Sequence, residues 1–207
     1  LRGDRIRFAI PYLEMCKKVL ELKPTTLITG HFKPIEGQEL IYNEVKNLHD
    51  AVEYIHNETV AGINSGKDMY ELMREIVLPK KLLVGEGYGT VEWAIRSIYE
   101  GYTGWFRHQS TTELYAYSPQ TIFSDLNNLI DKKSALKTIA DLIASSEYLK
   151  AIHLCEIMSS SDDNIEALKM YHEIHIILLK EAQMNSNRWI VKWLEAEIEA
   201  TKNKLNA

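Results

Sequence analysis

A histidine placed between a glycine and a proline is the residue of this chain whose position most favours metal chemistry. His31 lies between Gly30 and Pro34, directly after the β-branched run of residues 25–29. Such a run predicts a short strand, and α/β folds usually place their ligands at the carboxyl ends of strands. Imidazole nitrogen is a common zinc ligand. The sequence therefore makes His31 a candidate metal ligand, with a loop histidine that caps a turn as the alternative.

A glycine-rich loop offers a second kind of chemistry, the binding of an anion. Gly85, Gly87 and Gly89 precede a helix expected over residues 91–102, and Tyr88 adds a phenol hydroxyl. Backbone amides at a helix N-terminus favour negative charge. The spacing does not match a dinucleotide fingerprint, because no strand precedes the loop and no βαβ unit surrounds it. The alternative is a helix-entry loop that needs glycine for its dihedral angles.

Two histidines near the end of the chain have the spacing His-x-x-His. His172 and His175 flank Glu173 and Ile174, but a zincin requires His-Glu-x-x-His on one helical face. A partly buried helix in a helical pair is the favoured interpretation. The other histidines, at positions 49, 56, 108 and 153, show no partner pattern.

The elements that must position these residues change character along the chain. A helix over residues 12–22 followed by the strand of residues 25–29 predicts an α/β segment. A long helix is then expected over residues 38–64, ended by Gly66. Its apolar residues recur at steps of four and three and form a seam along one side: Ile41, Val45, Leu48, Val52 and Ile55.

The remainder of the sequence predicts helices. Asp68 and Glu71 form a capping box that starts a short helix to about residue 76, and Ser118-Pro119 starts another helix. Paired antiparallel helices with a loop at residues 159–163 follow, and they weakly resemble a tetratricopeptide unit. A final amphipathic helix carries two tryptophans, at positions 189 and 193.

Two stretches carry a family resemblance. One is Tyr88-Gly89-Thr90-Val91-Glu92-Trp93, continuing to Gly104-Trp105-Phe106, and the other is His56-Asn57-Glu58-Thr59-Val60 with Gly62, Asn64 and Gly66. Together they resemble the dimerisation domain of alkyl sulfatases, which are zinc hydrolases of the metallo-β-lactamase superfamily. The resemblance implies a mainly α fold. Residues 1–37 would be the C-terminal remnant of a metallo-β-lactamase-like catalytic domain, and residues 38–207 a helical dimerisation domain.

The resemblance also implies roles for individual residues. The segment around His31 is similar to the last metal-ligand loop of the metallo-β-lactamase fold, where a histidine binds one of two zinc ions. Alkyl sulfatases tend to have Ser-His-His-Trp-Pro there, so substrate identity can differ. Arg2 and Arg7 match the spacing of an Arg-Gly segment that helps to hold the substrate sulfate, and Tyr88 would also contact that anion. Lys81 occupies a place where relatives have histidine.

The function implied is that of a C-terminal part of a zinc-dependent hydrolase of sulfate esters, with two zinc ions in each complete subunit and helices that form a homodimer. We expect the chain alone to be inactive, because the His-x-His-x-Asp-His segment that supplies most metal ligands would lie upstream of Leu1. A non-catalytic helical dimerisation or protein-interaction module is the alternative. The residues preceding Leu1 would separate the two.

Composition and hydropathy argue against nucleic acid as a partner and against a segment that spans a membrane. The net charge of -5 and the pI near 5.8 provide no basic stripe for a phosphate backbone, so nucleic acid is not expected as a partner. No apolar run reaches the roughly 18 residues of a membrane span. Cys16 and Cys155 lie in expected helices and predict buried thiols. The compartment stays open.

Overall fold

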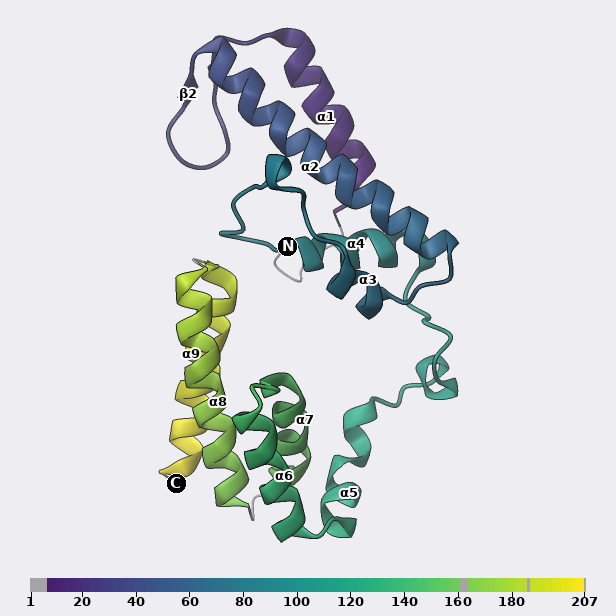
Figure 1. The fold of residues 1–207 in the computed structure, drawn as a ribbon, viewed down its shortest axis with the longest axis vertical. Helices are drawn as coiled ribbons and strands as arrows, with labels where there is room; N and C mark the ends of the chain where they lie inside the picture. Colours follow the sequence, from purple (N-terminus) through teal and green to yellow (C-terminus); the bar gives the residue numbers. More distant parts are fainter. Residues whose placement is uncertain (1–6, 161–163, 186, 207) are drawn as a thin grey trace. The chain divides into compact units, whose positions relative to one another are not determined.

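A computed structural model gives the fold of the chain (Figure 1). The chain is mainly α-helical, as predicted. The structure describes residues 7–160, 164–185 and 187–206. They divide into two compact units, residues 1–106 and 107–207, each treated separately below. None of the helices in the described ranges is both long enough and apolar enough to cross a membrane.

The first unit is built around one long helix. In chain order its elements are α1 (Ala9–Leu22), β1 (Thr26–Leu27), β2 (Ile35–Glu36), α2 (Gln38–Asn64), α3 (Met69–Glu75), the 3-10 turn η1 (Lys80–Leu82) and α4 (Val91–Thr103). Helix α1 packs along α2, and both α3 and α4 pack together near the other end of α2. The predicted bounds of α2 are confirmed.

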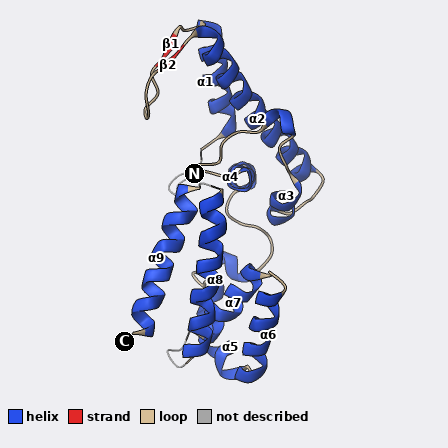
Figure 2. Cartoon of the chain, turned by 60° about the vertical axis from the view of Figure 1, so that its left-hand side comes forward, coloured by secondary structure: helices blue, strands red, loops and turns tan. Residues whose placement is uncertain are grey.

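The predicted strand of residues 25–29 is only two residues long. β1 pairs with β2 in an antiparallel hairpin, with Thr26 opposite Glu36 and Leu27 opposite Ile35 (Figure 2). Ile28 is 78% exposed, so the β-branched run has no core to pack against beyond Leu27. His31 consequently lies in the loop of a hairpin rather than at the edge of a larger sheet.

The buried side of α2 differs from the predicted apolar seam. Ile41 and Ile55 are buried, but Leu48 is 38% exposed. Polar residues take much of the buried face instead: His49, His56 and Thr59. The Thr59 hydroxyl donates to the Ile55 carbonyl one turn earlier, at 2.6 Å, which satisfies its hydrogen-bonding capacity inside the core.

The end of α2 requires two glycines for different reasons. Gly66 has φ of +81° and terminates the helix in a Schellman motif, in which Lys67 N donates to Gly62 O and Gly66 N donates to Ile63 O. Gly62 allows α3 to approach, because a Cβ at this position would lie 2.2 Å from Cδ2 of Leu72. Leu72 is itself 2% exposed and cannot swing into solvent.

Side-chain caps begin the two following helices. Asp68 accepts a hydrogen bond from Glu71 N at 2.9 Å and starts α3, as the sequence predicted. Thr90 accepts from Trp93 N at 3.2 Å and starts α4. The core beneath these helices is one cluster of buried apolar residues: Ala51, Ile55, Leu72, Leu78, Ile95 and Ile98.

The second unit consists of short turns followed by antiparallel helices. Its elements are η2 (Thr111–Leu114), η3 (Pro119–Ile122), α5 (Phe123–Leu129), α6 (Lys132–Ala144), α7 (Tyr148–Met158), α8 (Ile165–Met184) and α9 (Arg188–Leu205). Ser118 caps η3 with Pro119 at its first position, as predicted. The paired helices are confirmed, since α6 packs on α7, α7 on α8 and α8 on α9.

The core of the second unit uses small residues to bring its helices close together. Its buried members are Ala135, Ile139, Ala151, Cys155, Met158, Ala167 and Ile174.

Both cysteines of the chain, Cys16 in α1 and Cys155 in α7, are free and buried, so the prediction of buried thiols is confirmed. Burial raises the pKa of the Cys155 thiol to about 12, which keeps it protonated and unreactive at neutral pH.

We predict that Gly62→Ala destabilises the first unit because the new methyl group would overlap the Leu72 side chain. Overpacking of this kind costs about 1–3 kcal/mol of unfolding free energy. Leu72→Ala, which leaves a cavity, costs about 2–5 kcal/mol. In the double variant the clash is gone, so urea denaturation should give a loss smaller than the sum of the two.

Gly85→Ala is the matched control, because none of the described residues other than its chain neighbours has an atom within 4 Å of the position of its Cβ. It should change the unfolding free energy by no more than about 1 kcal/mol. Strict additivity of Gly62→Ala and Leu72→Ala would contradict the proposed contact.

Candidate functional site

The predicted metal ligand His31 is exposed in the hairpin loop between β1 and β2. The Thr29 hydroxyl donates to the His31 carbonyl, and the neighbouring Phe32 has φ of +67° and is 82% exposed. Among the described residues, the one group of three or more potential ligands that could share an ion does not include His31. The chain therefore offers one imidazole here, and any metal bound to it would need ligands from outside the described residues.

The residues predicted to hold an anion are exposed wherever the structure describes them. Arg2 lies outside the described residues, and Arg7 is exposed just before α1. Tyr88 is 44% exposed in the loop before α4, and Lys81 is exposed in η1. The roles of these residues therefore stay predictions.

The N-terminus of α4 already holds a carboxylate. Glu86 Oε1 accepts a hydrogen bond from Val91 N at 2.8 Å, which is the amide that a bound anion would use. An anionic ligand at the glycine-rich loop would have to displace Glu86 or bind beside it. The loop thus supplies its own negative charge to the helix.

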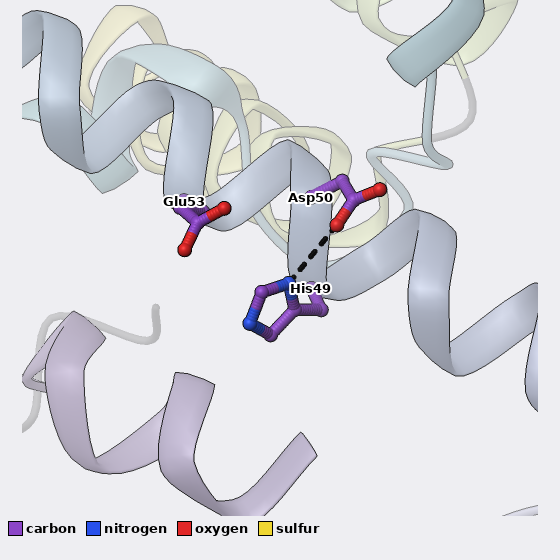
Figure 3. A group of neighbouring side chains, drawn as sticks. All are labelled: His49, Asp50 and Glu53. Carbon is purple, nitrogen blue, oxygen red and sulfur yellow. Dashed lines mark hydrogen bonds and ion pairs between the residues drawn. The ribbon is translucent and has the colours of Figure 1, made fainter. Parts of the chain in front are cut away.

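The group of possible metal ligands lies on α2, where His49, Asp50 and Glu53 offer ligand atoms within 4.8 Å of one another (Figure 3). His49 is 6% exposed, and its Nδ1 lies 3.0 Å from Asp50 Oδ1. Within the described chain its Nε2 has no hydrogen-bond partner. The sequence analysis found no partner pattern for His49 and did not single out Asp50 or Glu53, although the spacing His-Asp-x-x-Glu places all three within about one turn of a helix.

A lysine already occupies the acidic part of this group. Lys46 Nζ forms a hydrogen-bonded ion pair with Asp50 one helical turn later. That hydrogen bond, with a smaller contribution from His49, lowers the pKa of Asp50. Because the carboxylate already has a cation and an imidazole as partners, the arrangement is a charge network along α2, and it carries no metal assignment.

His56 joins α2 to α4. Its Nε2 lies 2.8 Å from the hydroxyl of Tyr102, and its Nδ1 lies 3.1 Å from Asn57 Oδ1. Since the amide oxygen can only accept, Nδ1 carries the proton and Nε2 accepts from the tyrosine. The imidazole is 9% exposed and both of its nitrogens are used, so His56 is a structural residue.

The histidines of the His-x-x-His pattern lie on α8 and do not form a metal group with other described residues. His175 is 4% exposed, and its Nδ1 lies 2.8 Å from the Tyr171 carbonyl. Nδ1 of His172 is buried without a partner in the part of the chain that the structure describes. The interpretation as a partly buried helical pair agrees with this placement.

The fold and these contacts define the class of protein as a helical module. In it, residues of the sequence motifs hold the helices together. Of the residues quoted for the resemblance, His56 bonds to Tyr102 and Gly62 admits Leu72. The sequence model of the alkyl sulfatase dimerisation family matches residues 68–199, well over half of the chain. The chain belongs to this family.

Relatives that match about half of the chain are named as sulfatases of alkyl esters or of alkyl and aryl esters. A linear primary-alkylsulfatase of Pseudomonas sp. is 32% identical over 112 residues, which are 52% of this chain and 21% of that protein. An alkyl/aryl-sulfatase of Saccharomyces cerevisiae is 26% identical over 113 residues, 51% of this chain and 18% of that protein. The chain spans about a fifth of the length of these relatives.

A solved structure has the same fold. The stereoselective inverting sec-alkylsulfatase Pisa1 from Pseudomonas sp. matches 96% of this chain and 32% of its own chain, with a TM-score of 0.81 and 18% identity. At this identity the likeness concerns the fold alone. It extends beyond the region of the family match and includes most of the first unit.

We predict that Tyr102→Phe lowers the unfolding free energy by about 1 kcal/mol, because the substitution leaves the buried Nε2 of His56 without its donor. Tyr115→Phe is the control, since Tyr115 is 71% exposed. Chemical denaturation of both variants measures the difference. Equal stability of the two variants would mean that the His56–Tyr102 bond contributes nothing.

Proposed function

We propose that the chain is the subunit-pairing part of a larger hydrolase of alkyl sulfate esters. The match of the alkyl sulfatase dimerisation family to residues 68–199 carries this proposal. The fold likeness to a sec-alkylsulfatase over 96% of the chain supports it. Because the chain spans a small part of these proteins, their activity is assigned here only to the complete protein.

The proposed catalytic contribution of this chain is a single metal ligand. His31 would donate an imidazole nitrogen to one of two zinc ions, and a two-metal centre activates water and stabilises the leaving oxygen of an ester. The exposure of the hairpin loop supports this role, since an exposed imidazole can enter a centre built by other segments. Residues 1–37 would then be the end of a catalytic domain of the metallo-β-lactamase fold.

Three further residues would hold the sulfate. Arg2 and Arg7 would donate paired hydrogen bonds from their planar guanidinium groups to the tetrahedral anion. Tyr88 would donate from its phenol hydroxyl. The exposure of Arg7 and Tyr88 leaves both side chains accessible to a ligand.

The proposed pairing is that of two identical chains, which is the commonest assembly of soluble proteins. Exposed aromatic side chains at the end of the first unit support it. Tyr102 is 57% exposed and Trp105 is 70% exposed. Tryptophan and tyrosine are enriched among the residues that contribute most to binding energy in protein interfaces.

We predict that His31→Ala in the complete enzyme lowers bound zinc below the value of about two ions per chain that a two-metal hydrolase requires. Elemental analysis of the purified protein measures the metal content. His153→Ala is the control, because this side chain is 75% exposed on α7 and its recorded bond among the described residues is to Glu156. Unchanged zinc in His31→Ala would remove His31 from the centre and favour the non-catalytic helical module.

We predict that Trp105→Ala weakens self-association by about 2 kcal/mol or more, which is at least about tenfold in the dissociation constant. Sedimentation equilibrium over a concentration series measures it. Leu129→Ala, at an 82% exposed position of α5, is the control and should associate like the unaltered chain. A chain that is monomeric at every concentration would contradict the pairing itself.

A further inference from the structure

A glutamate in the second unit holds the backbone of the turn that precedes it. Glu113, in η2, accepts hydrogen bonds from three backbone amides through its carboxylate. Its Oε2 accepts from Arg107 N at 2.7 Å, and its Oε1 accepts from Ser110 N at 3.0 Å and from Gln109 N at 3.3 Å. Both carboxylate oxygens are therefore used, and the bond to Arg107 reaches six residues back along the chain.

The backbone of this turn is shaped to receive a negative charge. His108, between two of the donors, has φ of +58°, which is uncommon for a residue other than glycine. Backbone amides on either side of a left-handed residue can converge on one point, and such concavities bind anions. An ionised acceptor also forms stronger hydrogen bonds than a neutral one. The chain fills this concavity with its own carboxylate.

Apolar packing contributes little to the order of the same segment. None of residues 107–122 is buried, and Arg107 and Glu113 are the two that are half-buried. The large apolar side chains of the segment face solvent, with Leu114 55% and Tyr115 71% exposed. Segments with few buried apolar contacts open at a low cost in free energy. The order of the turn therefore rests mainly on polar bonds, and three of them converge on Glu113.

We propose that Glu113 is a conformational latch, which opens residues 107–113 without unfolding the helices α4 and α5. While the carboxylate is bonded, these residues form one closed turn. Because the second unit begins at Arg107, the latch sets how much of the connection between the two units is ordered. The inference is independent of the proposed hydrolase function, since the bonds that carry it lie within residues 107–113.

Limited trypsin digestion of the whole chain tests the latch, because trypsin cleaves after Arg107, inside the turn. Glu113→Gln keeps the shape of the side chain but leaves one acceptor oxygen, so it cannot accept at both ends of the turn. We expect initial cleavage after Arg107 to become at least about tenfold faster, as the loss of one hydrogen bond to a charged group implies. Initial cleavage after Arg96, within α4, should stay unchanged.

Glu199→Gln, at an exposed position of α9 in the same unit, is the charge-matched control and should be cleaved like the unaltered chain. Hydrogen exchange of the unaltered chain gives a second measurement that needs no variant. The amides of Arg107 and Ser110 should exchange more slowly than in an unfolded chain, but faster than the amides of α4 and α5.

Equal cleavage after Arg107 in Glu113→Gln and in the unaltered chain would overturn the inference. Faster initial cleavage after Arg96, or a lower helix content by circular dichroism, would also overturn it, because Glu113 would then support the fold as a whole. Exchange of the Arg107 and Ser110 amides at the rate of an unfolded chain would show that the turn is not closed, and the inference would fail.

Discussion

The close approach of α3 to the end of α2 is the constraint on which the first unit depends. Leu72 fills the space where a side chain at position 62 would begin, so any residue larger than glycine forces the Leu72 side chain to shift. Thr59 lies about one helical turn before Gly62, and its hydroxyl bonds to the Ile55 carbonyl. His56 lies about one turn earlier again, and its Nε2 bonds to the Tyr102 hydroxyl. The result is a buried face near the C-terminal end of α2 that combines apolar residues with hydrogen-bonded polar ones.

These contacts give a physical meaning to residues on which the sequence resemblance rests. The histidine contributes an acceptor for Tyr102, the threonine bonds its own helix, and the two glycines allow a close contact and a left-handed helix end. A pairing domain must present a fixed surface to its partner, and helices anchored in this way provide one. Trp105, which is exposed just after α4 in the first unit, is a candidate for that surface.

Much of the fold could be predicted from the sequence because its signals are local. Asp68, Thr90 and Ser118 stand where helices begin, and Gly66 stands where α2 ends. The buried face of α2 was harder to predict, since His49 replaces Leu48 in the core, and only the packing of α1 and α4 decides which side of a helix is covered. The strand before His31 was overestimated for a similar reason: β-branched residues favour extension, but pairing partners set its length.

The candidate site was predicted only in part, because its elements depend on residues far apart in the chain. The ligand role of His31 requires groups beyond the described residues, whereas the Tyr102 partner of His56 lies 46 residues away and has no local signal. Likewise, Tyr171 of α8 bonds to Glu197 of α9, 26 residues away, and a pattern read along one helix cannot predict that partner.

Native-state hydrogen exchange of the α2 amides tests the central claim, that residues 56–62 anchor the first unit. Amides in this stretch should exchange only by global unfolding of the unit, with the highest protection in residues 7–106. In Gly62→Ala, the protection of α3 and α4 should fall together with that of α2, because the three share one packing contact. Fast local exchange of residues 56–62, with α3 and α4 still protected, would contradict the account.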